Sequence, residues 1–202
     1  MPWRCFSAET VPWLCVVLIT WEVFGDDFNA ADEEMAAVTR VYYPLVYVEE
    51  VLPILNDIAI FGGFNDRQLY EIFKLLKTTC YEAGEFIYRR GDGPSHIYIV
   101  KNGEVKVIID QENISLELAS LTVGECFGET SVIGIQPHFS SAVADRTTEL
   151  IVLERKVLLN IFERDKELFG LLILNIARET SRRLRKSEEE LANYVFRELS
   201  TS

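Results

Sequence analysis

The sequence has few of the residues from which most catalytic and metal sites are built. Its 202 residues include only two histidines, His96 and His138, and four cysteines. No two cysteines have the CxxC spacing of a zinc or redox site. The motifs GxSxG, HExxH and the P-loop are all absent. The sequence therefore predicts no enzymatic activity and no metal site, and its cysteine pattern fits a reducing, cytoplasmic compartment.

Basic residues are also scarce. There are 20 Lys and Arg against 32 Asp and Glu, which gives a net charge of −12. Nucleic-acid binding needs clustered positive charge, so we expect no nucleic-acid partner. The longest uncharged stretch near the N-terminus, residues 10–21, has 12 residues, whereas a bilayer span takes about 20. We therefore expect no transmembrane span. We also expect no signal peptide, because Glu9 precedes the apolar run and no small-residue cleavage site follows it.

Composition and periodicity divide the chain into three parts. Residues 1–50 form an acidic N-terminal extension with a short apolar run at residues 11–24. Residues 51–165 read as a globular domain, and residues 166–202 as a C-terminal helix. We expect the apolar run of the extension to pack on the domain or on a partner.

The pattern of the central part changes from helices to short strands. Apolar spacing predicts one helix that ends near Gly62 and a second that is capped by Asn65 or Asp66. Short β-branched and aromatic runs between turn residues then predict a series of strands, followed by a helix at residues 155–163. The expected strands are residues 86–88, 97–100, 105–109, 116–121, 141–143 and 150–153. Several short strands at this spacing are typical of a sandwich or small barrel.

Residues 124–144 have the pattern of a cradle for a small anion. Gly124 and Gly128 permit tight turns, and residues 129–134 can form one helical turn whose free N–H groups point toward its start. Glu129 lies in an apolar context, where an unpaired carboxylate would be costly. We therefore expect either a ligand hydroxyl or a protein donor to hydrogen-bond to Glu129.

Two of these stretches resemble a known family. GEFIYRRGDGPSHIYIVKNGEVKVII (residues 84–109) and VGECFGE (residues 123–129) are similar to the cyclic nucleotide-binding domain of catabolite activator proteins, protein kinase A regulatory subunits and cyclic nucleotide-gated channels. The resemblance covers roughly residues 50–190. It implies a mainly β fold, a jelly-roll-like β-roll (double-stranded β-helix) with N-terminal helices and a long C-terminal helix. It also implies a phosphate-binding cassette at residues 124–144 with cAMP or cGMP as ligand and no other cofactor.

The resemblance also implies roles for individual residues. In the family a Gly-Glu pair binds the ribose, and the Glu accepts a hydrogen bond from the 2′-hydroxyl; these roles fall on Gly128 and Glu129. An Arg near the end of the cassette normally pairs with the phosphate, and His138 stands at the matching position. The ligand-binding residues implied in this way are Phe127, Gly128, Glu129, Thr130, Ser131, His138, Phe139, Ser140 and Ser141.

His138 changes the expected affinity. Removing one side of a desolvated charge pair costs on the order of 2–5 kcal/mol, and a neutral His brings neither the charge nor the forked geometry of a guanidinium. Protonation of His138 beside a phosphate would restore part of the interaction, so affinity should increase as the pH falls from about 8 to about 6. The alternative is that His138 is only an exposed loop residue.

The C-terminal helix carries a second functional signal. An apolar or small residue recurs along it at heptad-like or half-heptad intervals, at Ile173, Ala177, Leu184, Leu191 and Val195, with Ile176 and Thr180 between them. In transcription factors of the family the equivalent helix pairs two subunits, so we expect a homodimer; the alternative is that residues 168–176 pack on the roll and the rest is solvated. A basic band at residues 178–186 precedes three Glu residues, which predicts a solvated, self-paired face. We expect no DNA-binding helix-turn-helix, since the sequence ends at Ser202.

Two functional hypotheses follow. In the first, the chain is a stand-alone cytoplasmic sensor: a cyclic nucleotide or related small anion enters the cassette, the C-terminal helix moves, and a partner protein responds. In the second, the domain is degenerate, its cassette is empty or filled by a side chain, and the fold serves as a dimerisation and docking scaffold. The cassette arginine that is missing favours the scaffold, whereas Gly128 and Glu129 favour the sensor.

Overall fold

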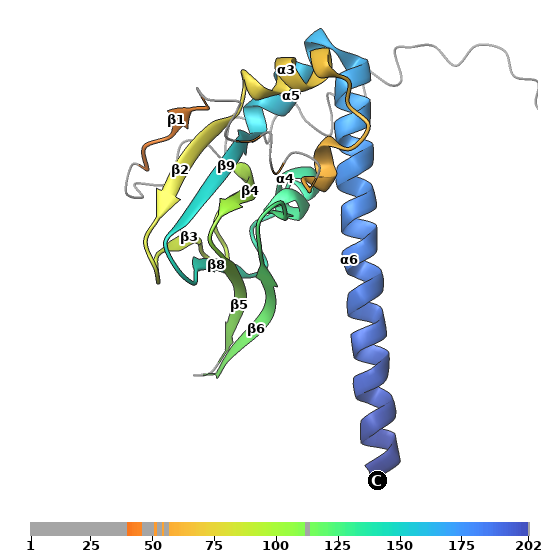
Figure 1. The fold of residues 1–202 in the computed structure, drawn as a ribbon. Coiled ribbons are helices and arrows are strands. Elements are labelled where there is room, and N and C mark those ends of the chain that lie inside the picture. Colours follow the sequence, from red (N-terminus) through yellow and green to blue (C-terminus); the bar gives the residue numbers. More distant parts are fainter. Residues whose placement is uncertain (1–39, 46–50, 52–53, 55–56, 112–113, 202) are drawn as a thin grey trace, which may run out of the picture. The chain divides into compact units, whose positions relative to one another are not determined.

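The computed structural model describes residues 40–45, 51, 54, 57–111 and 114–201. Most of the predicted N-terminal extension, and part of the helix predicted before Gly62, lie outside these residues. Within them the chain forms two antiparallel sheets, several short helices and one long C-terminal helix (Figure 1). This confirms the predicted fold class.

Nine strands build the two sheets. They are β1 (Tyr43–Pro44), β2 (Lys77–Tyr81), β3 (Phe86–Tyr88), β4 (His96–Asn102), β5 (Val105–Gln111), β6 (Ile114–Leu121), β7 (Cys126–Phe127), β8 (Ser141–Ala144) and β9 (Thr148–Glu154). The five-stranded sheet has the order β1-β2-β9-β4-β7, and the four-stranded sheet has the order β3-β8-β5-β6. All six predicted strands are present. The sequence patterns missed β1, β2 and β7; β2 follows a helix with no Gly or Pro to mark its start, and β1 and β7 have only two residues each.

The helices predicted after Asn65, at residues 155–163 and at the C-terminus begin and end close to the predicted positions. The helix predicted to end near Gly62 appears, within the described residues, only as a 3-10 turn, and Ile58 before this turn is extended. Asn65 caps α3 with its side chain, and Gln68 returns the hydrogen bond to the Asn65 backbone, which completes a capping box. Before it, the described residues contain the 3-10 turn η3. The helical elements are η3 (Ala59–Phe61), α3 (Asp66–Phe73), α4 (Glu129–Gly134), α5 (Arg155–Arg164) and α6 (Lys166–Thr201).

Strand β4 is buried on both faces, because it separates two cores. Ile97 and Ile99 face the helices, where they share a cluster with Ile72 and Leu172. Tyr98 and Val100 face the interior of the roll, together with residues of β5 and β8. Successive side chains of a strand point to opposite faces, so a strand with two buried faces reads as a continuous apolar run rather than as an alternation.

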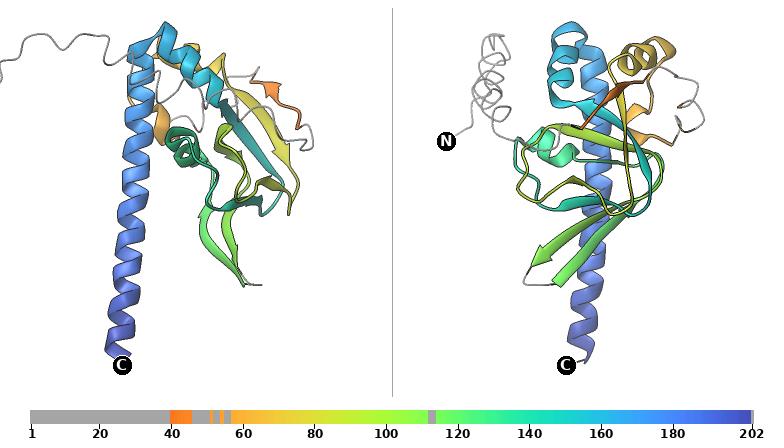
Figure 2. Two further views of the ribbon diagram at one scale, coloured as in Figure 1. Left: turned by 180° about the vertical axis from the view of Figure 1, so that it is seen from behind. Right: turned by 90° about the vertical axis from the view of Figure 1, so that its left-hand side faces the viewer.

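The long helix α6 has two different halves. Leu168, Leu172 and Ile176 are buried against η3 and α5. Beyond Arg183, residues 184–200 are exposed, and the ribbon views show the C-terminal end of α6 extending past the two sheets (Figure 2). Among the helices that the structure describes, none is long and apolar enough to cross a lipid bilayer.

Candidate functional site

The predicted cassette begins beside the middle of β4. Strand β7 pairs with β4, with Phe127 opposite Tyr98, and the chain then turns at Gly128 into α4. Gly128 has a φ of 81°, and a Cβ at this position would lie 2.7 Å from the His96 carbonyl oxygen. A side chain there would meet both backbone strain and a steric clash, so glycine is required.

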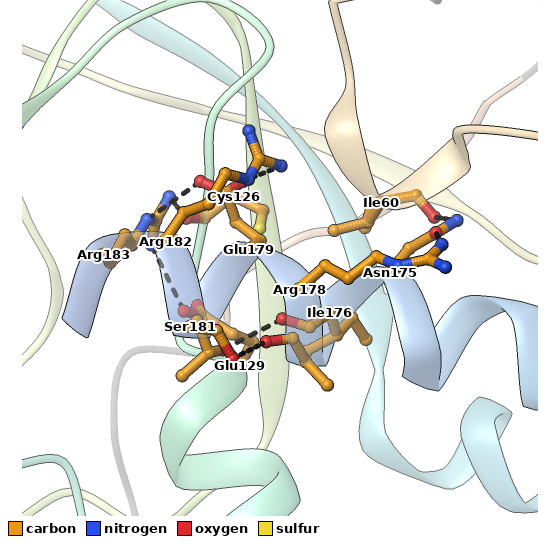
Figure 3. A network of polar contacts seen from close by, with 12 residues as sticks. Ile60, Cys126, Glu129, Asn175, Ile176, Arg178, Glu179, Ser181, Arg182 and Arg183 are labelled. Carbon is orange, nitrogen blue, oxygen red and sulfur yellow. Dashed lines mark hydrogen bonds and ion pairs between the residues drawn. The ribbon is translucent and has the colours of Figure 1, made fainter. Parts of the chain in front are cut away.

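Glu129 is the first residue of α4, and it is 2% exposed. Its carboxylate forms an ion pair with Arg183 of α6, in which Nη1 lies 3.2 Å from Oε1 (Figure 3). Arg183 also donates to the Cys126 carbonyl oxygen through Nη2. Burial raises the pKa of Glu129, and the charge of Arg183 opposes this rise. Of the two donors expected for Glu129, the structure therefore provides the protein donor.

Arg183 reaches Glu129 because α6 is anchored two turns earlier. The Asn175 side-chain amide donates to the carbonyl oxygens of Ile60, at 3.2 Å, and Gly62, at 2.7 Å. Eight residues of helix advance about 12 Å, which carries Arg183 from the level of η3 to the level of the cassette. Arg183 also pairs with Glu179 on its own helix, 3.2 Å away. The sequence predicted that the basic band pairs only with acidic residues of its own helix. Arg183 departs from this prediction, because it also contacts Glu129 of the cassette.

His138 is buried, with 5% of its surface exposed. The alternative of an exposed loop residue is therefore wrong. Its ring stacks on Tyr88 with centroids 3.7 Å apart and planes 13° from parallel, and its Cε1 lies 3.7 Å from the position that a Cβ on Gly128 would occupy. Burial lowers the pKa of His138 to about 4, although Asp92 opposes the change. His138 is thus neutral near pH 7.

The other predicted ligand-binding residues do not all gather around Gly128. Phe127 is buried and stacks on Tyr98. Ser131 is buried in α4, whereas Thr130 is exposed. The Ser141 hydroxyl accepts a hydrogen bond from the Arg90 backbone N–H at 3.0 Å. At the end of the cassette, Ser140 is half-buried and Phe139 is 70% exposed, with the Arg90 guanidinium 5.6 Å from its ring.

Sequence reasoning missed three residues of the site. Tyr88 and Tyr98 join His138 and Phe127 in one aromatic cluster inside the roll. Arg183 was included only in a basic band of the C-terminal helix. The available signal was the buried carboxylate of Glu129, which needs a donor, but several arginines of the band could have supplied it. Within the described residues, no group of three or more His, Cys, Asp or Glu side chains is placed to hold a metal ion.

Comparisons with known proteins identify the family and the fold. Residues 78–165 match the protein-family profile described as "Cyclic nucleotide-binding domain". The fold is similar to a crystal structure of a cyclic nucleotide-binding domain from Methylobacillus flagellatus KT, with a TM-score of 0.68 and 24% identity, over 77% of this chain and 88% of that one. It is also similar to the Thermus thermophilus catabolite activator protein, with a TM-score of 0.60 and 29% identity, over 68% and 63% of the two chains.

A curated relative gives a similar result over a limited range. The cyclic nucleotide-gated channel beta-3 of Canis lupus familiaris is 29% identical over 148 residues, which cover 70% of this chain and 19% of the channel. The chain thus spans less than a fifth of the length of this relative.

Proposed function

Since this chain contains a member of the cyclic nucleotide-binding domain family, we propose that it is a non-catalytic sensor. It binds a cyclic nucleotide (cAMP or cGMP) or a related anion in the cassette 124–144, and it signals through α6. The observation that carries the proposal is the ion pair between Glu129 of the cassette and Arg183 of α6. One side chain thereby belongs both to the ligand site that the family implies and to the contact that holds the C-terminal helix.

The coupling works through the shared carboxylate. An ionised carboxylate has about four acceptor positions, so Glu129 can accept a ligand hydroxyl while Arg183 keeps it charged. A ligand that strengthens or weakens the contact with Arg183 changes the relative stability of the two positions of α6, and it acts only through this difference. By linkage, the position of α6 changes the affinity for the ligand by the same factor.

Calorimetric titration with cAMP and cGMP at pH 6 and pH 8 tests the sensor. We expect weak binding, because a neutral His138 does not replace the charge of the family's Arg, a loss of about 2–5 kcal/mol. We also expect equal affinity at the two pH values, since a pKa of about 4 leaves His138 uncharged at both; this replaces the pH dependence expected from the sequence. No heat and no thermal stabilisation at millimolar nucleotide would refute the sensor.

Substitution of Arg183 tests the coupling in the same experiment. Arg183→Gln should weaken nucleotide binding about tenfold, because Glu129 loses the charge that keeps it ionised. Arg182→Gln is the matched control, since Arg182 pairs with Glu179 and its side chain is 66% exposed. Equal nucleotide affinities of the two variants would show that ligand binding does not depend on the contact between α6 and the cassette.

The scaffold is the second candidate function, and His138 favours it. The ring lies neutral and buried on Tyr88 in the part of the cassette where the family places a cation. His138→Arg distinguishes the two candidates: tight nucleotide binding by this variant would show that the rest of the cassette is competent. No binding by a variant that keeps its thermal stability would favour a scaffold that docks an unidentified protein partner.

We further propose that α6 joins two copies into a homodimer. The support is the exposed apolar surface of its second half, where Leu184 is 60% exposed and Leu191 is 63% exposed. Sedimentation equilibrium tests the dimer. A cytoplasmic location is part of the proposal, and it is supported by the buried free thiol of Cys126 and the exposed free thiol of Cys80.

A further inference from the structure

The turn that follows β3 lies against the end of the cassette. The Gly91 N–H donates to the His138 carbonyl oxygen at 2.8 Å, and the His138 N–H donates to the Asp92 carbonyl oxygen at 2.9 Å. One residue earlier, the Arg90 N–H donates to the Ser141 hydroxyl at 3.0 Å. These three hydrogen bonds fix the backbone of Arg90 beside the last part of the cassette.

The cassette itself brings no positive charge to this end. Residues 124–144 contain no Lys or Arg. His138 is neutral near pH 7, because burial lowers its pKa to about 4. Arg183 reaches the cassette from α6, but it pairs with the carboxylates of Glu129 and Glu179. A phosphate is bound best by charged donors, so the charge for it has to come from a neighbouring element.

Arg90 offers such a charge. Its side chain is exposed, and its guanidinium lies 5.6 Å from the centre of the Phe139 ring. A guanidinium at this distance is attracted to the face of an aromatic ring, so the contact holds the charge beside the cassette. Among the ion pairs between residues that the structure describes, none includes Arg90. Its guanidinium donors therefore remain available to a ligand.

The adjacent Arg89 lies differently. Its guanidinium is 3.7 Å from the centre of the Phe86 ring, and its N–H donates to Asp92 Oδ2 at 2.7 Å. Neither contact involves a residue of the cassette. Asp92 is also the acidic group whose charge acts on His138, so an anion that binds at this end needs a cation to offset Asp92. Arg90 is the cation that contacts the cassette.

We propose that Arg90 binds the phosphate of the ligand, in place of the arginine that the cassette lacks. This inference rests on the proposed function and names the residue that supplies its positive charge. The planar guanidinium matches two phosphate oxygens with two parallel N–H donors. The phosphate then lies at the outer edge of the cassette, beside Phe139, and not on the buried ring of His138. Because this contact is open to solvent, it replaces only part of the missing interaction.

Arg90→Gln tests the assignment by calorimetric titration with cAMP and cGMP. We expect nucleotide affinity to fall about tenfold, because the substitution removes a charge-assisted hydrogen bond. Arg89→Gln is the matched control, since it removes the same charge from the same turn, and it should change affinity by less than about twofold. Both side chains are exposed, so both variants should keep the melting temperature of the unaltered chain.

Salt dependence gives a second readout of the same contact. Between about 0.05 M and about 0.5 M salt, nucleotide affinity of the unaltered chain should fall more steeply than that of Arg90→Gln, because salt screens an exposed charge. Arg90→Lys keeps the charge without the fork, so its affinity should lie between those of the unaltered chain and Arg90→Gln. Affinity of Arg90→Lys equal to that of Arg90→Gln would contradict a role for the charge.

The outcomes separate the role of Arg90 from the sensor. If the unaltered chain binds nucleotide and the Gln variants of Arg89 and Arg90 have equal affinities, the sensor stands and the assignment of the phosphate to Arg90 is overturned. The same salt dependence in the unaltered chain and in Arg90→Gln would also overturn it. Absence of nucleotide binding by the unaltered chain would refute the sensor, and this inference with it.

Discussion

Arg183 Nη1 lies 3.2 Å from Glu129 Oε1, although the two residues are 54 positions apart in the sequence. The contact joins the first turn of α4 to the middle of α6. The side chain of Glu129 is 3% exposed, and the side chain of Arg183 is 30% exposed. A carboxylate buried to this degree is stable as an ion only with a partner. The pair therefore fixes the position of the C-terminal helix over the cassette.

Arg183→Gln should lower the free energy of unfolding by about 2 kcal/mol, because it leaves the buried carboxylate without its countercharge. We set this below the value for a fully buried pair, since Arg183 is partly exposed. Arg182→Gln, the control, should change stability by less than about 0.5 kcal/mol. In a double-mutant cycle with Glu129→Gln, measured by urea unfolding, additive effects would show that the two side chains do not interact.

The sequence allowed the need for this contact to be predicted, but not the partner. An acidic residue between apolar neighbours requires a donor, and this argument holds for Glu129 without any structure. Which arginine provides it depends on the rotation of α6 about its axis. That rotation is set by Asn175 and by the burial of Leu172, contacts that join residues more than 100 positions apart.

The same limit applies to His138. Its place at the end of the cassette could be read from its spacing to Glu129, but its environment could not, because the ring that covers it belongs to Tyr88 on β3. Most strands were predictable, since their β-branched runs and turn residues are local signals. The strands that escaped prediction are only two residues long or lack a turn residue at their start, and they form by pairing with distant segments: β2 with β9, β7 with β4, and β1 with β2.

Gly128→Ala should destabilise the domain by more than about 2 kcal/mol, since a Cβ would lie 2.7 Å from the His96 carbonyl oxygen and 3.3 Å from Tyr98 Cδ2, at a φ of 81°. Gly93→Ala is the matched control, because no atom lies within 4 Å of its Cβ position and its φ is not positive. Thermal unfolding of both variants checks the prediction. Equal melting temperatures would mean that the turn before α4 is not as tight as described.

Asn175→Ala should detach the start of α6 from η3. The side-chain amide is 6% exposed and donates to two carbonyl oxygens, so its removal leaves the carbonyls of Ile60 and Gly62 without this donor. We expect a loss of about 2–3 kcal/mol. Leu174→Ala, at an adjacent residue that is 45% exposed, should have an effect of less than about 0.5 kcal/mol. Hydrogen exchange of the first turns of α6 should increase in the first variant alone.

His138 makes the stability of the domain depend on pH. The pKa of its imidazole is about 4 in the folded chain and about 6.5 in an unfolded one. Below pH 6.5 the unfolded chain therefore binds more protons, and the free energy of unfolding decreases as the pH falls toward 4. The full contribution is about 3 kcal/mol, and it is present only above the unfolded pKa.

His138→Phe isolates this contribution, because phenylalanine keeps a ring that can stack on Tyr88 but does not titrate. Carboxyl groups such as Glu129 titrate in both proteins, so the difference between the two unfolding free energies reports His138 alone. We expect this difference to change by about 3 kcal/mol between pH 7 and pH 4 in favour of the variant. Denaturant unfolding across this range measures it. Parallel curves for the two proteins would mean that His138 is exposed to solvent and protonates as freely in the folded chain as in the unfolded one.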